Sequence, residues 1–174
     1  DPGLLSRVAI VLARLAERDS SGSSKTRPER SLREIFLNWY PQTAANLEQR
    51  MQALDALAAT VPDVAWRLCI RLLPIYGGDH SMTTSRPEWR DWRDGWSRGV
   101  SKAEYWLGVK EVVDRLMDWV AQAESRWIDL LNDIGNVPSE RRDEFVERLA
   151  SVMQAGDTSA ECRSQIWHTL RGVL

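Results

Sequence analysis

The sequence predicts an all-α fold in which amphipathic helices pack in antiparallel pairs. Apolar residues recur at helical spacing along most of the chain. Several segments begin with a residue suited to cap a helix and end near proline or glycine. The alternating runs that indicate strands are missing from the sequence. Because most connections are short, we expect a solenoid-like stack, HEAT- or tetratricopeptide-like and of right or left hand, of about seven to eight helices.

The first half of the chain is predicted to form four helices, over residues 4–18, 31–40, 44–60 and 62–73. The first carries apolar residues at helical spacing, namely Leu4, Leu5, Val8, Val11, Leu12 and Leu15. Ser31 and Glu34 form a capping box at the start of the second. Pro41 ends it, because a residue before proline avoids the helical region. Pro62 suits the first turn of the fourth helix, which is apolar on most sides and should be central.

The second half of the chain repeats this organisation after one interruption. Helices are predicted from the capping box Ser101–Glu104, around Trp127, from Pro138, and from the capping box Thr158–Glu161. The interruption is an irregular insert rich in Trp and Arg over residues 75–100, and residues 19–30 are predicted to be a flexible loop. We expect residues 1–174 to form a single α-helical domain. The first residue is Asp1 rather than Met, which indicates a fragment of a larger chain.

The composition is that of an ordinary globular protein, with 43% hydrophobic residues, 28% charged residues and a net charge of -2. This charge balance argues against a nucleic-acid partner. No apolar run approaches the roughly 20 residues that cross a bilayer. Cys69 and Cys162 belong to no zinc-ligand spacing, so we expect two buried apolar thiols in a cytoplasmic protein. No metal or cofactor is expected.

Nine tryptophans are unusual in a chain of this length, and three of them fall in the insert. If that segment is helical, its tryptophans lie on one face and its arginines on an adjacent face. Trp and Arg are enriched at binding hot spots. The candidate partner-binding residues are Tyr76, His80, Arg86, Trp89, Arg90, Trp92, Arg93 and Trp96. The alternative is that the tryptophans anchor the insert on the helices, which is the commoner role of an aromatic stripe at helical spacing.

No constellation in the sequence indicates an enzyme. Asp79, His80 and Ser81 include the residue types of a hydrolytic triad, but triad groups normally meet in space from separate elements. Gly77 and Gly78 lack the phosphate-loop pattern and the strand that precedes it. Carboxylates are scattered over the predicted helix surfaces, so paired-carboxylate catalysis is not indicated.

Four segments, taken in order, resemble a known kind of helical region. They are Ser31–Thr43, Pro62–Leu68, Leu72–Pro74 and Arg86–Trp92. The set is similar to the α-helical sensor region of large multidomain bacterial proteins that carry an N-terminal effector or STAND-type NTPase module. Some of those proteins act in antiphage defence. The resemblance implies a scaffold or sensing region, with any catalysis in other parts of the parent chain, and it implies no catalytic residues here.

The leading hypothesis is a non-enzymatic interaction or sensor module that binds a protein partner or orders neighbouring domains of its parent chain. A second hypothesis is a small-molecule pocket between helices, lined by Trp39, Trp66 and Trp106. A third is a purely structural spacer, which a buried Trp89–Trp96 face would favour.

Overall fold

The computed structural model describes residues 2–18, 28–74, 100–156 and 158–173. Across these ranges every regular element is helical, which confirms the all-α prediction. The elements are α1 (Pro2–Arg18), α2 (Pro28–Phe36), α3 (Leu47–Thr60), α4 (Pro62–Arg71), α5 (Lys102–Trp119), the 3-10 turn η1 (Val120–Gln122), α6 (Glu124–Asn132), the 3-10 turn η2 (Ile134–Asn136), α7 (Ser139–Ala155) and α8 (Ala160–Val173).

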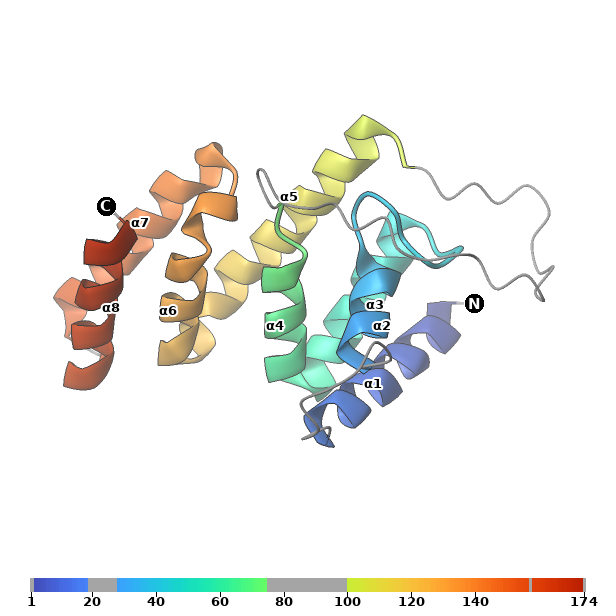
Figure 1. Ribbon diagram of the computed structural model, residues 1–174, viewed down its shortest axis with the longest axis horizontal. Helices are drawn as coiled ribbons and strands as arrows, with labels where there is room; N and C mark the ends of the chain where they lie inside the picture. The colour runs from blue at the N-terminus through green and yellow to red at the C-terminus, as the bar shows by residue number, and fades with distance from the viewer. Residues whose placement is uncertain (1, 19–27, 75–99, 157, 174) are drawn as a thin grey trace.

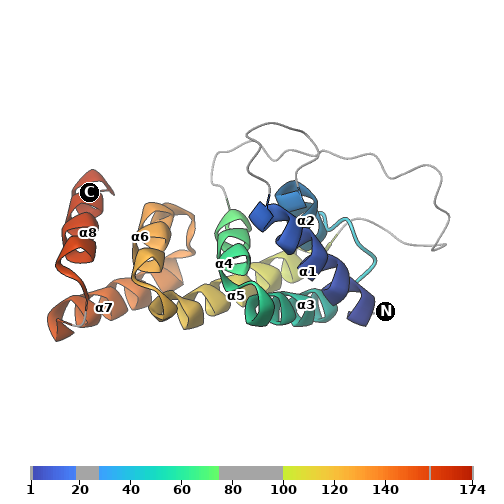
Figure 2. The same ribbon diagram turned by 90° about the horizontal axis from the view of Figure 1, so that it is seen from below.

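The helices follow one another broadly in sequence order along the long axis of the molecule (Figure 1). In the second view α3, α5 and α7 form one row, and α4, α6 and α8 stand beside one another across it (Figure 2). At the N-terminal end, α1 packs against α3 and α2, and at the other end α8 packs against α6. The long helix α5 connects the two ends and contacts α3 and α4.

Helix α2 begins and ends earlier than the sequence predicts. It starts at Pro28, so residues 28–30 are helical rather than part of a loop, and Ser31 lies inside the helix instead of capping it. Pro28 fits a first turn because its missing N–H is not needed there. The helix ends at Phe36 and not at Pro41, because long-range contacts take over: the Leu37 carbonyl accepts from the Arg50 Nη1 at 2.9 Å.

Two helix starts also differ from the predicted ones, and each is set by a side-chain cap. Helix α3 begins at Leu47 rather than Ala44, because Asn46 and Gln49 form a reciprocal capping box. For α8 the Cys162 N–H donates to the Ser159 Oγ at 3.2 Å, so Ser159 takes the capping position predicted for Thr158. The predicted start of α5 is confirmed, since the Ser101 Oγ accepts from the Glu104 N–H at 3.1 Å. This is the half of the predicted capping box that the structure shows.

The buried core runs through every helix of the described ranges, and in α4, which the sequence predicts to be central, it includes five of the ten residues. Val64, Ala65, Trp66, Leu68 and Cys69 of α4 are all buried. Further along the chain, the Trp127 ring of α6 packs against the Phe145 ring of α7, with 5.7 Å between ring centroids. Apolar contacts therefore continue from the N-terminal helices to α7.

Both cysteines are buried and neither forms a disulfide, as the sequence predicts. Burial raises the pKa of the Cys69 thiol from 9.0 to about 12. Above pH 9 the unfolded thiol loses its proton while the folded thiol keeps it, so stability should fall as pH rises through this window.

Between about pH 8 and about pH 10 we expect the free energy of unfolding of the wild-type protein to fall by about 1 kcal/mol more than that of a Cys69→Ala variant. Urea titrations followed by circular dichroism at both pH values measure the difference. The Cys162→Ala variant is the control and should keep the Cys69 contribution. If the free energy of unfolding changed with pH in the same way in the wild type and in Cys69→Ala, the Cys69 thiol would have the same pKa in the folded and unfolded protein.

Candidate functional site

All eight candidate partner-binding residues lie outside the described ranges. Tyr76, His80, Arg86, Trp89, Arg90, Trp92, Arg93 and Trp96 all fall between residues 75 and 99. Their contact with a partner, and the alternative in which the tryptophans anchor the insert on the helices, both stay predictions.

The three tryptophans of the predicted small-molecule pocket lie in different environments. Trp66 is buried in α4, where its Nε1 donates to the Asp129 Oδ2 of α6 at 2.9 Å. The Arg126 guanidinium lies 5.1 Å from the Trp66 ring, so the indole is used to join α4 to α6. Trp39 is half-buried and Trp106 is exposed. One hollow beside α2 and α4 and another between α5, η1, α6 and α7 are lined by other side chains.

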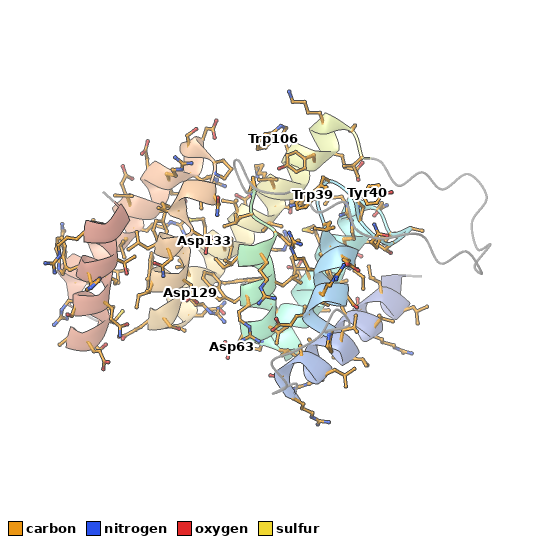
Figure 3. All side chains as sticks on the ribbon, in the orientation of Figure 1. Trp39, Tyr40, Asp63, Trp106, Asp129 and Asp133 are labelled. Carbon is orange, nitrogen blue, oxygen red and sulfur yellow. The ribbon has the colours of Figure 1, made fainter. Side chains whose placement is uncertain are left out.

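Trp39, Tyr40 and Trp106 lie near one another towards the upper edge of the molecule in Figure 3, whereas Asp129, the hydrogen-bond partner of Trp66, lies lower and closer to α7 and α8. The Tyr105 and Trp106 rings meet edge to face with centroids 5.0 Å apart. The Arg33 guanidinium lies 5.8 Å from the Trp39 ring centroid. Trp39 and Trp106 therefore lie in the same region of the molecule, whereas Trp66 lies elsewhere.

A stripe of large apolar side chains on α1 is the most prominent exposed feature of the described residues. Leu4, Val8, Val11 and Leu15 are between 41% and 60% exposed. We call these four residues the α1 stripe. On another side of the same helix Ala9 and Ala13 are fully buried. The helix itself packs against α2 and α3 (Figures 1 and 2). Contiguous exposed apolar side chains of this kind are typical of interaction sites.

The small size of two alanines explains why α1 leaves its larger residues in water. Because Ala9 and Ala13 carry only a methyl group and are fully buried, α1 can lie close to the helices against which it packs, α2, α3 and α4. Leu5 and Leu12 are partly buried and pack on the edge of the core. The stripe residues point to a third direction, where none of the described helices covers them.

Three exposed arginines border the α1 stripe on one side only. At 3.6 residues per turn, Arg7, Arg14 and Arg18 follow one edge of the stripe. Arg14 is held in place, because its Nη1 lies 3.2 Å from Glu17 and its Nη2 donates to the Thr60 carbonyl at 3.3 Å. The other edge of the stripe continues into Leu5 and Leu12. The surface is therefore apolar with one basic border.

The hollow between α5, η1, α6 and α7 has a volume of about 530 Å³. Its lining includes the buried side chains of Met117, Val120 and Trp127, together with the exposed Asp118 and Glu147. The Arg148 Nη1 donates to the Met117 carbonyl at 3.1 Å, so the one basic group in the lining serves the helix end. The rim of this hollow is therefore acidic. The apolar side chains at its base are already buried by the protein itself.

The sequence interpretation missed the α1 stripe because it used the apolar residues of this helix only as evidence that the segment is helical. The signal that could have identified it is the spacing of four, three and four residues between Leu4, Val8, Val11 and Leu15, which is that of a helix–helix seam. Ala9 and Ala13, which are four positions apart and therefore lie on the same side of the helix, indicate the face that packs closely. Neither pattern says by itself which of the two faces the core takes.

Two further observations bear on what the site can do. Within the described ranges, no group of three or more His, Cys, Asp or Glu side chains could hold a metal ion. Among the helices that the structure describes, none is both long and apolar enough to cross a membrane.

Compared with models of protein families, with curated proteins and with solved structures, the chain matches none.

Proposed function

We propose that this chain is a non-enzymatic α-helical interaction or sensor module of a larger bacterial protein, and that the α1 stripe docks on a protein partner or a neighbouring domain. The helices would stack as antiparallel pairs in a solenoid-like array, in the cytoplasm. The resemblance to sensor regions that accompany STAND-type NTPase or antiphage-defence modules agrees with this role. The exposure of the α1 stripe carries the proposal.

A partner that covered the α1 stripe would gain binding free energy from burying its apolar side chains. Fully burying one leucine or valine side chain contributes roughly 1.5 to 3 kcal/mol. Four half-exposed side chains in one row therefore offer several kcal/mol to any surface that covers them, before the cost of association is subtracted. A helix that only needed to support its own domain would gain stability by turning these residues inward.

A photo-crosslinking amino acid at Val11 tests the proposal in cells that produce the protein naturally. We expect a discrete crosslinked product, because Val11 lies in the middle of the α1 stripe. The same amino acid at Asp143, an exposed residue of α7, is the control position. Adding Leu4→Glu and Leu15→Glu should remove the Val11 product while circular dichroism shows the fold intact.

Two outcomes of the crosslinking experiment would count against the proposal. One is the same set of products from positions 11 and 143, which would reflect random encounters. The other is a Val11 product that survives both glutamate substitutions, because charges placed at the two ends of an apolar docking surface should prevent its burial.

A further inference from the structure

The α1 stripe has the geometry of one side of a two-helix contact. Its residues are spaced by four, three and four positions, so they form one row of a and d positions. At 1.5 Å per residue the row is about 16 Å long, or three helical turns. A row this long and narrow matches a single helix laid along α1 better than a broad protein surface.

The charges beside the row distinguish between possible partners. With Leu4 and Val11 at d positions and Val8 and Leu15 at a positions, Arg7 and Arg14 occupy g positions and Arg18 the following d position. Positions e and g of a helix face the flanking residues of its partner and set partner choice. A helix docked on the stripe must therefore accept a row of guanidinium groups along one border.

A second copy of this chain fits that border poorly. In an antiparallel pair of α1 helices the g positions face each other, so Arg7 and Arg14 would meet arginines. In a parallel pair a g position faces the e position five residues further on, so Arg7 would face Leu12, which is partly buried in its own core, and Arg14 would face position 19, outside the described residues. Arg18 would meet Arg18 at a d position. Among residues 2–18 of α1 that the structure describes, neither arrangement places a carboxylate opposite the arginines. The only acidic side chain described on α1, Glu17, is paired with Arg14.

We propose that the segment recognised by the α1 stripe is an acidic amphipathic α-helix, with apolar residues facing the stripe and Asp or Glu facing Arg7, Arg14 and Arg18. This inference rests on the proposed docking function and adds the chemistry of the partner. Opposite charges along the border favour the correct partner and hold it in register. Because the arginines lie along one border only, the partner needs its carboxylates on the matching flank.

A pair of synthetic helical peptides tests the charge preference. Both peptides carry leucine at the a and d positions of three heptads, and one has glutamate and the other lysine at every e and g position. The charges therefore meet the arginines whether the peptide binds parallel or antiparallel to α1. Repulsion between like charges keeps each peptide monomeric. We expect fluorescence anisotropy to show the glutamate peptide binding at least about tenfold more tightly at low salt. The difference should shrink at high salt, since exposed charges are screened.

Two variants separate the possible outcomes. Arg7→Glu with Arg14→Glu should reverse the preference in favour of the lysine peptide, whereas Val8→Glu with Val11→Glu should abolish binding of both. Equal binding of both peptides, unaffected by the arginine reversal, would overturn the acidic-helix inference while leaving docking by the α1 stripe intact. If neither peptide binds and the Val11 crosslink is also missing, the proposed function itself fails.

Sedimentation measurements provide the test for a second copy. The protein should stay monomeric as its concentration rises, with the Val8→Glu and Val11→Glu variant indistinguishable from wild type. A concentration-dependent dimer that these two substitutions remove would overturn the inference in favour of self-association through the α1 stripe.

Discussion

Replacing Arg50 with alanine should lower the free energy of unfolding by about 3 kcal/mol, because this charged residue of α3 is buried and hydrogen-bonded. Arg50 is only 1% exposed. Its Nη1 donates to the Leu37 carbonyl at 2.9 Å, and its Nη2 lies 3.5 Å from the Glu104 Oε1 at the start of α5. Alanine would leave the Leu37 carbonyl without this donor and open a cavity where the aliphatic stem packs.

The conservative variants separate the contributions of Arg50. Burial lowers the pKa of the guanidinium, and the carboxylate of Glu104 opposes that shift. Because Glu104 is partly exposed, its ion pair should contribute less than about 1 kcal/mol. Arg50→Met keeps the stem and should cost about half as much as alanine, while Glu104→Gln should cost little. Urea denaturation followed by circular dichroism measures all three, and a Glu104→Gln effect as large as that of Arg50→Ala would contradict this ranking.

The helices that the sequence predicts well are those whose ends are set locally. The start of α4 follows from Pro62 and that of α5 from Ser101, because a fixed φ angle and a side-chain cap act within one turn. The reciprocal box of Asn46 and Gln49 is equally local and was legible in the sequence. Its pattern differs from the Ser/Thr boxes only in the capping residue.

Features that depend on distant parts of the chain could not be predicted in this way. The end of α2 is set by Arg50, which bonds to Leu37 from thirteen residues further on, and by Asn38, whose Nδ2 donates to the Leu72 carbonyl at 3.3 Å. The exposure of the α1 stripe depends on which face α3 accepts. Hydrophobic periodicity identifies an amphipathic helix, but two apolar faces on one helix give it two possible burial directions.

Gly108 should tolerate no larger residue while Asn38 is present, because these two residues form the contact between the chain after α2 and the middle of α5. A Cβ at position 108 would lie 2.6 Å from the Asn38 Oδ1 and 3.2 Å from its Cγ. Asn38 is buried and bonded to Leu72, so it cannot withdraw without losing that hydrogen bond. Overpacking should cost about 1 to 3 kcal/mol, which exceeds the roughly 1 kcal/mol that alanine gains in a helix.

A double-mutant cycle turns this contact into a prediction of sign. Gly108→Ala should destabilise the wild-type protein, yet in an Asn38→Ala background the same substitution should be neutral or stabilising, because the space is free and the helix propensity of alanine remains. Gly172→Ala in α8, where a Cβ would meet nothing within 4 Å, is the matched control and should be neutral or stabilising in both backgrounds. Thermal and urea denaturation give the four free energies of the cycle.

A Gly108→Ala effect of the same size with and without Asn38 would mean that the two residues do not couple, and that another neighbour, such as Leu47 with its Cδ1 at 3.4 Å, limits this position.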